Sequence, residues 1–172
     1  MAATREELMA FFDELGIETS TVEHKAVFTV AESDEVLDHL PGGHTKNLFL
    51  KDKKGNLFLI VAEQSARIDL KAVGPLIGAS GRVSFGKPEL LMEVLGVEPG
   101  SVTPFSLIND RGNQRVSVIF DAHMMGHELL NYHPLKNTAT TSIKAEDLMK
   151  FARACGHEPR ILKVSEQSQD IE

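Results

Sequence analysis

The segment NYHPLKNTATTSI, residues 131–143, places polar side chains where a fully buried strand would carry apolar ones. Its threonines favour an extended backbone, in which alternate side chains point to the same face. Within it lie an imidazole, an amide and several hydroxyl groups, carried by His133, Asn137, Thr138, Thr140, Thr141 and Ser142. Two interpretations are open: a half-exposed edge strand with its threonines in water, or one wall of a pocket that binds a small polar ligand.

The sequence on either side of this segment indicates an α+β fold. Val116–Phe120 reads as a core strand, and residues 144–154 read as an amphipathic helix with Leu148 and Phe151 on one face. Along the chain, predicted strands follow one another like hairpins rather than alternating with long helices. This order favours a mixed, mostly antiparallel and strongly curved sheet in a single domain, residues 1–164. The polar end, residues 165–172, predicts a flexible tail.

The predicted elements run along the whole chain. Helices are predicted at Arg5–Leu15, with Thr4 as N-cap, and at Ala31–His39, Asp69–Ile77, Pro88–Leu95 and Ala145–Cys155. Strands are predicted at Thr19–His24, Thr45–Lys51, Leu57–Ala62, Arg82–Phe85, Phe105–Ile108, Val116–Asp121, Leu129–His133, Thr138–Ile143 and Arg160–Val164.

Composition narrows the class of protein. The chain has 172 residues, of which 42% are apolar and 25% are charged, and its net charge is −7. No apolar stretch reaches the length needed to cross a bilayer, so no membrane partner is expected. The single cysteine, Cys155, fits a reducing cytoplasm. The negative charge argues against non-specific coating of nucleic acid, and a DNA partner is not expected.

Familiar catalytic and metal-binding motifs are missing from the sequence. His123 and His127 have the spacing of two metal ligands on one helical face, but Met124 stands where a zinc hydrolase carries its glutamate. No third ligand is evident, so no metal site is predicted. A G-x-S-x-G elbow and the nucleotide-binding glycine motifs are also absent. We therefore expect no serine nucleophile and no cofactor.

Two further segments complete a recognisable pattern. Taken together, TKNLFL (residues 45–50), GSVTPF (100–105) and YHPLKNTATTS (132–142) resemble the YbaK-type aminoacyl-tRNA deacylase family, which includes the editing domain inserted in many bacterial prolyl-tRNA synthetases. The last segment is most similar to the branch called PrdX or ProXp-ala, which hydrolyses alanine wrongly attached to proline tRNA. The resemblance covers about residues 22–163 and implies a twisted, barrel-like sheet with helices packed outside. It also implies a tRNA partner, and it leaves prolyl-tRNA synthetase open as a second one.

The resemblance also suggests which residues act. Lys46 matches a lysine important for activity in the family. The loop at Gly100 and Ser101 matches one that lines the aminoacyl pocket, where backbone N–H groups could stabilise an oxyanion. His133 could orient substrate or water. The predicted catalytic residues are therefore Lys46, Gly100, Ser101 and His133. Predicted substrate contacts are Val27, Phe28, Asn47, Phe49, Val102, Thr103, Pro104, Asn137 and Thr138, and predicted tRNA contacts are Lys51, Arg82 and Lys136.

The size of alanine explains why such an enzyme is needed. A synthetase pocket built for proline cannot exclude the smaller alanine, because each missing methylene supplies only about 1–3 kcal/mol of discrimination. A second, smaller hydrolytic site can admit alanine and reject proline. The sequence leaves two alternatives open: a deacylase for another residue, such as cysteine on proline tRNA, and a non-catalytic module that binds tRNA or another RNA.

Overall fold

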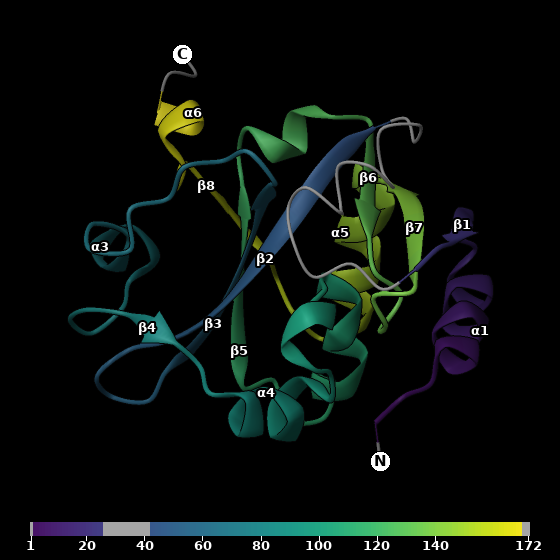
Figure 1. The fold of residues 1–172 in the computed structure, drawn as a ribbon, viewed down its shortest axis with the longest axis horizontal. Coiled ribbons are helices and arrows are strands. Elements are labelled where there is room, and N and C mark those ends of the chain that lie inside the picture. Colours follow the sequence, from purple (N-terminus) through teal and green to yellow (C-terminus); the bar gives the residue numbers. More distant parts are fainter. Residues whose placement is uncertain (1, 26–41, 170–172) are drawn as a thin grey trace.

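The computed structural model describes residues 2–25 and 42–169. Its strands are β1 (Thr19–Glu23), β2 (Gly43–Lys51), β3 (Leu57–Glu63), β4 (Ser84–Phe85), β5 (Val116–Asp121), β6 (Leu129–Tyr132), β7 (Ala139–Lys144) and β8 (Arg160–Leu162). They form one sheet in the order β1-β7-β6-β2-β3-β5-β8, and β4 pairs with β2 on the side (Figure 1). The pairs β1–β7, β6–β7, β2–β3 and β2–β4 are antiparallel, whereas β2–β6, β3–β5 and β5–β8 are parallel. The predicted α+β fold with a mixed, mostly antiparallel sheet is confirmed, although the strands of the described residues do not close into a barrel.

The helices lie outside the sheet, as the resemblance implied. They are α1 (Arg5–Leu15), α3 (Val73–Ile77), α4 (Pro88–Leu95), α5 (Ala145–Ala154) and α6 (Glu166–Gln169), with 3₁₀ turns η1 (Pro99–Ser101), η2 (Pro104–Asp110) and η3 (Met124–Gly126). The N-cap prediction for α1 is confirmed: the Thr4 hydroxyl accepts from the Glu7 backbone, and the Glu7 carboxylate accepts from the Thr4 backbone. In the described part of the chain, no helix has both the length and the apolar character to cross a membrane.

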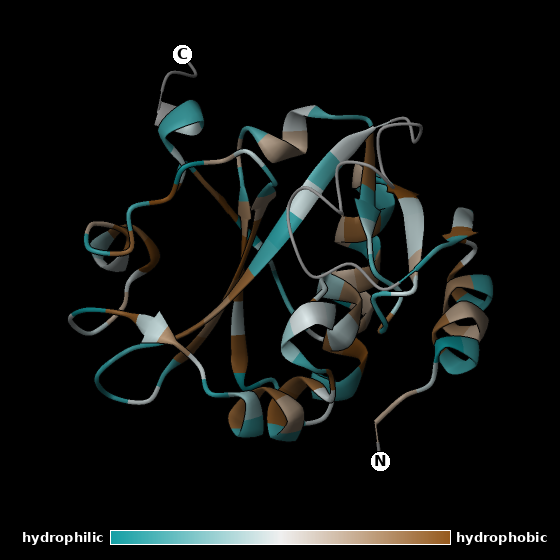
Figure 2. Ribbon diagram, in the orientation of Figure 1, coloured by the Kyte–Doolittle hydropathy of each residue, from teal (hydrophilic) through white to brown (hydrophobic). Residues whose placement is uncertain are grey.

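Two apolar clusters cover the two faces of the sheet. The larger one joins α1, η2 and α5, whose Phe12, Phe105 and Phe151 rings pack edge to face or tilted with centroids 5.1 to 5.6 Å apart. The smaller one packs Val73 and Ile77 of α3 against the other face. Strand β3 lies between the two clusters and is hydrophobic along most of its length (Figure 2).

One predicted strand is wrong. The apolar run Phe105–Ile108 belongs to the 3₁₀ turn η2. The turn begins where the Thr103 hydroxyl accepts a hydrogen bond from the Phe105 backbone N–H at 3.3 Å and where Pro104 supplies a fixed φ. Every residue of the run is buried. A short apolar run of this kind has no periodicity that separates a strand from a buried helical turn.

The edge-strand interpretation of residues 131–143 is also wrong. Strand β7 lies between β1 and β6 and is therefore paired on both sides. Thr140 and Thr141 are almost completely buried, with exposed fractions of 2% and 0%. Their hydroxyl groups are satisfied by protein partners instead of water: Thr141 Oγ1 lies 2.8 Å from Thr21 Oγ1, and Thr140 Oγ1 lies 2.7 Å from a ring nitrogen of His24.

The remaining differences lie at the ends of elements and at the chain end. Helix α3 begins at Val73 rather than Asp69, whose carboxylate accepts from the Lys71 backbone N–H in a turn. The predicted helix Ala31–His39 lies outside the described residues. In the segment predicted to be a flexible tail, Glu166–Gln169 form α6, and Ser165 and Ser168 are buried.

Candidate functional site

The polar side chains of β6 and β7 gather on one face of the sheet. Asn131 lies directly opposite Ser142, so the two side chains share a face with Thr140, two residues along β7. The Ser142 hydroxyl donates to Asn131 Oδ1, and Asn131 Nδ2 donates to the Gly43 carbonyl of β2 at 3.2 Å. The alternate polar residues of the segment therefore line one face, as the pocket-wall interpretation requires.

Two histidines adjoin this polar face. The rings of His24 and His133 lie 6.2 Å apart, and His24 Nε2 contacts the Thr140 hydroxyl. His133 Nδ1 lies 3.0 Å from the Ala139 carbonyl. A carbonyl oxygen only accepts, so this nitrogen carries the proton and Nε2 of the neutral ring can accept a hydrogen bond. Burial lowers the pKa of His133 and outweighs the bond to Ala139, which would raise it; the nearby His24 lowers it further. His133 is therefore neutral near neutral pH.

A cleft of about 370 Å³ brings together two of the predicted motifs. It is lined by Met92, Gly96, Val97, Glu98, Ser101, Leu135, Lys136, Asn137 and Thr138. Ser101 comes from the GSVTP loop, while residues 135–138 connect β6 to β7. Leu135 has a φ of 74°, which is unusual and strained for a side chain of its size. Strain of this kind is concentrated at binding and catalytic sites, so we take this cleft as the candidate site.

The GSVTP loop uses part of its backbone for its own structure. The Ser101 N–H donates to the Glu98 carbonyl at 2.9 Å, which closes η1. This N–H is therefore occupied and does not point at an oxyanion in this arrangement. Thr103 and Pro104 are buried and anchor the loop to the core, Val102 is half-buried, and Gly100 is exposed. Of this loop, Ser101 is the residue that lines the cleft.

Lys46 belongs to a different part of the structure. It lies on β2, opposite Ala62 of β3, and its Nζ donates to the Ala66 carbonyl at 2.5 Å. Burial lowers the pKa of Lys46. Its neighbours Asn47 and Phe49 point to the opposite face. Phe49 is part of the core there, and the Asn47 Oδ1 atom is buried with no hydrogen-bond partner in the described part of the chain. The predicted contacts Val27 and Phe28 lie outside the described residues.

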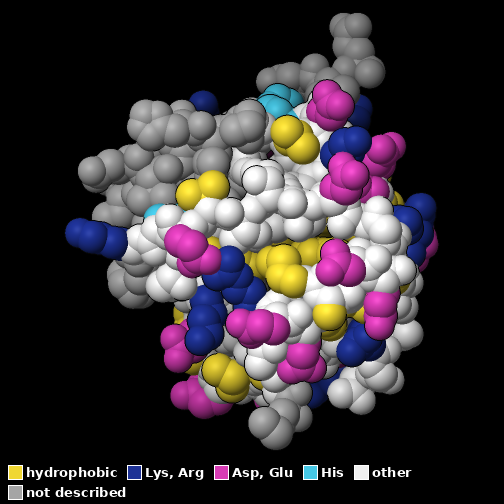
Figure 3. Space-filling model, turned by 90° about the vertical axis from the view of Figure 1, so that its right-hand side faces the viewer, with side chains coloured by type: hydrophobic (Ala, Val, Ile, Leu, Met, Phe, Trp, Pro, Cys, Tyr) yellow, Lys and Arg dark blue, Asp and Glu magenta, His cyan; other side chains and the backbone are white. Residues whose placement is uncertain are grey.

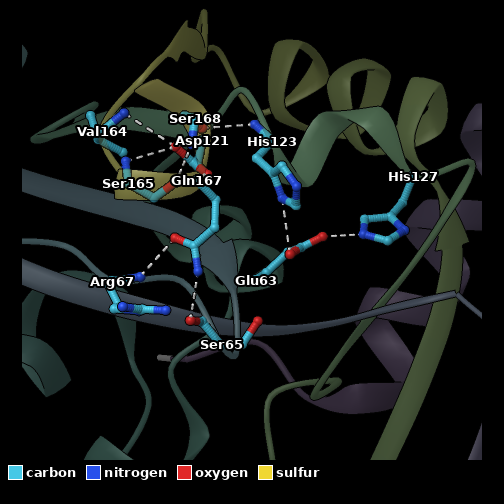
Figure 4. Close-up of polar contacts among 10 residues, drawn as sticks. All are labelled: Glu63, Ser65, Arg67, Asp121, His123, His127, Val164, Ser165, Gln167 and Ser168. Carbon is cyan, nitrogen blue, oxygen red and sulfur yellow. Dashed lines mark hydrogen bonds and ion pairs between the residues drawn. The ribbon is translucent and has the colours of Figure 1, made fainter. Parts of the chain in front are cut away.

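A second cavity, of about 380 Å³, lies near Lys46. Its lining consists of Gly42, Gly43, His44, Glu63, Gln64, Ser65 and His127. Both histidines of the HMMGH segment reach Glu63 here: His123 Nδ1 lies 3.0 Å from Oε2, and His127 Nε2 contacts Oε1 (Figure 4). Glu63 lies far away in the sequence, so no local motif could have revealed it. In residues 2–25 and 42–169, no group of three His, Cys, Asp or Glu side chains is placed to share a metal ion.

The predicted tRNA contacts fall in two places. Lys51 pairs with Ser84 of β4, and the exposed Arg82 lies two residues before this strand, so the two cations flank β4. Lys136 lines the candidate cleft instead. On the face that carries α1 and β1, basic and acidic side chains are interspersed rather than gathered into one basic area (Figure 3).

Comparison with known proteins gives a consistent picture. A sequence model of the aminoacyl-tRNA editing domain family matches residues 24–151. The chain is 40% identical over 162 residues to the mouse (Mus musculus) prolyl-tRNA synthetase associated domain-containing protein 1, covering 92% of this chain and 95% of that protein. It is 34% identical over 158 residues to the prolyl-tRNA editing protein ProX of Acetoanaerobium sticklandii, covering 89% and 93%. A crystal structure described as that of a candidate trans-editing enzyme for prolyl tRNA synthetase shares the fold, with a TM-score of 0.69, 20% identity, and coverage of 95% of this chain and 98% of that one.

Proposed function

The chain belongs to the aminoacyl-tRNA editing domain family, and we propose that it is a trans-editing hydrolase that removes alanine from mischarged proline tRNA. Aminoacyl-tRNA hydrolysis is the activity of the family. The choice of alanine rests on the likeness of NYHPLKNTATTSI to the alanine-specific branch. A role on proline tRNA agrees with the names of the relatives. We further propose that the protein acts in the cytoplasm.

The proposed reaction is a direct attack of water on an ester and needs no covalent intermediate with the enzyme. The substrate is an ester between the carboxyl group of the amino acid and a hydroxyl of the terminal ribose. A water oxygen adds to the carbonyl carbon, the ester C–O bond breaks, and the ribose oxygen leaves with a proton. The products are the free amino acid and uncharged tRNA. The protein has to place the water, stabilise one developing oxyanion and exclude larger amino acids.

The cleft between Ser101 and residues 136–138 is the observation that supports this proposal best. It joins the two sequence motifs that carry the resemblance, although they are far apart in the chain. Ser101, Asn137 and Thr138 offer hydroxyl and amide groups that can hold an ester carbonyl or a water molecule. We propose that they bind the aminoacyl group and that the neutral His133, whose Nδ1 lies 3.0 Å from the carbonyl of Ala139, the residue after Thr138, orients the water.

Lys46 keeps its proposed catalytic role, as a cation that binds the tRNA end or polarises the ester. Its position near the second cavity, rather than in the cleft, makes this assignment the sharpest one to test. For the tRNA itself, we propose that Lys51 and Arg82 beside β4 contact the phosphate backbone and that Lys136 contacts the terminal nucleotides at the cleft.

A deacylation assay with three substrates tests the proposed function. Proline tRNA is charged with alanine, cysteine or proline, and hydrolysis is followed with the full-length protein. We expect alanyl-tRNA to be hydrolysed well, cysteinyl-tRNA less well, and prolyl-tRNA scarcely at all. Preference for the cysteine ester would place the protein among cysteine deacylases. Binding of all three without hydrolysis would make it an RNA-binding module.

Two cleft variants locate the site. Asn137→Ala should lower kcat/KM for alanyl-tRNA(Pro) by roughly tenfold if its amide holds the substrate or the water. Lys150→Ala is the control, because Lys150 is an exposed residue of α5. Equal rates for Asn137→Ala and the wild type would place the reaction away from this cleft.

A further inference from the structure

The segment that follows β3 supplies the hydrogen-bond partner of Lys46. Ala66 is buried, with an exposed fraction of 3%, and its carbonyl accepts from Lys46 Nζ at 2.5 Å. The Ala66 N–H in turn donates to the Glu63 carbonyl at 3.0 Å. The position of the lysine ammonium group therefore depends on how firmly residues 65–67 are held.

Helix α6 holds this segment from the other side. Gln167 Nε2 donates to the Ser65 carbonyl at 3.1 Å, and the Arg67 N–H donates to Gln167 Oε1 at 3.1 Å (Figure 4). One side-chain amide thus bridges the two residues that flank Ala66. The Arg67 carbonyl also accepts from the Glu166 backbone N–H at 2.8 Å.

The helix itself is fixed on a buried carboxylate. Asp121, at the end of β5, accepts hydrogen bonds from the Val164 and Ser165 backbones at 3.2 and 3.1 Å. It also accepts from the hydroxyl groups of Ser165 and Ser168 at 2.7 and 2.6 Å. Asp121 is completely buried, so these bonds are not exposed to competition from water. A polar segment that looks like a tail is therefore hydrogen-bonded to the end of β5.

We propose that α6 is a positioning element for Lys46. The Gln167 amide fixes residues 65–67, and this segment presents the Ala66 carbonyl to the lysine ammonium group. The proposal rests on the proposed function, because the placement of Lys46 matters for activity only if Lys46 acts in deacylation. Gln167 touches neither substrate nor reacting atoms, and it acts through the segment that it holds.

The first test measures Lys46 directly, without any tRNA. The full-length protein is acylated with a limiting amine reagent over a range of pH, and the modification of Lys46 is quantified by peptide mass spectrometry. In Gln167→Ala the released segment should let water reach the ammonium group, and the reactivity profile of Lys46 should move to higher pH. Gln167→Glu keeps the acceptor for Arg67 but loses the donor to Ser65, and it should show the same change. Glu166→Ala removes an exposed ion pair to Arg67 (3.7 Å) but keeps both hydrogen bonds of the Gln167 amide, so it should leave the profile in place.

The second test measures kinetic coupling. Gln167→Ala should lower kcat/KM for alanyl-tRNA(Pro) roughly tenfold through misplacement of Lys46. In a Lys46→Ala background, the same change should cost nothing further, because the group that it positions is gone. A purely structural role of Gln167 would instead reduce activity in both backgrounds.

The outcomes separate this proposal from the proposed function. An unchanged Lys46 profile in both Gln167 variants, or equal losses of activity in the two backgrounds, would overturn the positioning role. If the profile moves but Lys46→Ala and Gln167→Ala both retain full activity, α6 does position Lys46, and the catalytic role of Lys46 is wrong.

Discussion

Lys46 is a charged side chain whose surroundings differ from those of an ordinary surface lysine. It is half-buried, its pKa is lowered by burial, and it has a carbonyl partner at 2.5 Å. We expect Lys46→Ala to lower kcat/KM for alanyl-tRNA(Pro) roughly a hundredfold, in line with the loss of one electrostatic stabiliser. The free energy of unfolding should fall by only about 1 kcal/mol, for the lost hydrogen bond.

The exposed residue Lys54 provides a control from the same hairpin. Lys54→Ala should leave the deacylation rate unchanged and should alter the free energy of unfolding by less than about 0.5 kcal/mol. Single-turnover hydrolysis measures the deacylation rate, and urea unfolding measures the free energy of unfolding. Wild-type activity of Lys46→Ala would remove this lysine from the mechanism.

The lowered pKa of His133 leads to a prediction about how stability depends on pH. Its pKa is lowered in the folded protein, first by burial. The unfolded chain therefore binds the proton more readily than the folded one. The contribution of neutral His133 to the free energy of unfolding is fully present above the ordinary histidine pKa of about 6.5 and is lost as pH falls below it. His133→Gln keeps a donor for the Ala139 carbonyl but cannot titrate. We expect urea unfolding between pH about 7.5 and about 5.5 to show a shallower pH dependence for this variant than for the wild type. Parallel curves would mean that His133 titrates equally in both states.

At the scale of elements, the turn between β2 and β3 depends on one carboxylate. Burial alone would raise the pKa of Asp52, but hydrogen bonds from the Ser80 backbone, the Asn56 side chain and backbone, and the Lys54 backbone hold it at about 2. The Asp52 carboxylate therefore contributes stability above its unfolded value of about 3.9, and this contribution is lost as pH falls toward 2.

Asp52→Asn tests this role of the turn. The amide retains one acceptor oxygen but places N–H donors against the backbone donors of the turn, so we expect lower stability at neutral pH. Because the stability contributed by the Asp52 carboxylate depends on pH, the difference in stability between the variant and the wild type should shrink as pH falls from about 5 toward about 2. Thermal unfolding of both proteins across this range measures it. A difference that is constant with pH would show that the carboxylate charge is not what the turn uses.

The individual helices and strands show what the sequence could and could not predict. Helix α4 and strand β5 match their predictions because periodic apolar residues and clear end signals such as Gly96 define them locally. The strand predicted at Phe105–Ile108 failed because a short apolar run reads alike in a strand and in a buried 3₁₀ turn. Whether β7 is an edge or an interior strand depends on its pairing with β1, which lies far away in the sequence.

Long-range contacts also limited the prediction of the site. The sequence suggested the GSVTP loop and the residues after Lys136, and the structure brings Ser101 and Asn137 into one cleft. The sequence did not suggest Ala66 or Gln167 as partners of the Lys46 region. A hydrogen bond to a backbone carbonyl leaves no trace in a sequence, and a polar chain end resembles a frayed one. The His123 and His127 spacing was visible, but their partner Glu63 was not.

At the scale of the whole molecule, a net charge of −7 has to be reconciled with a tRNA substrate. The proposed backbone and terminal-nucleotide contacts supply three cations, Lys51, Arg82 and Lys136, and Lys46 at the tRNA end adds at most one more, so binding should release few counterions. The slope of log K against log salt should lie between about −2 and −4, because each neutralised phosphate contributes about 0.7 to 0.9. Fluorescence anisotropy with uncharged proline tRNA, from about 50 to about 200 mM KCl, measures this slope. Each alanine variant of the three should reduce its magnitude by roughly one unit, whereas Lys54→Ala should not change it. A wild-type slope steeper than about −6 would require a broad basic surface and would contradict a protein that holds only the end of its tRNA.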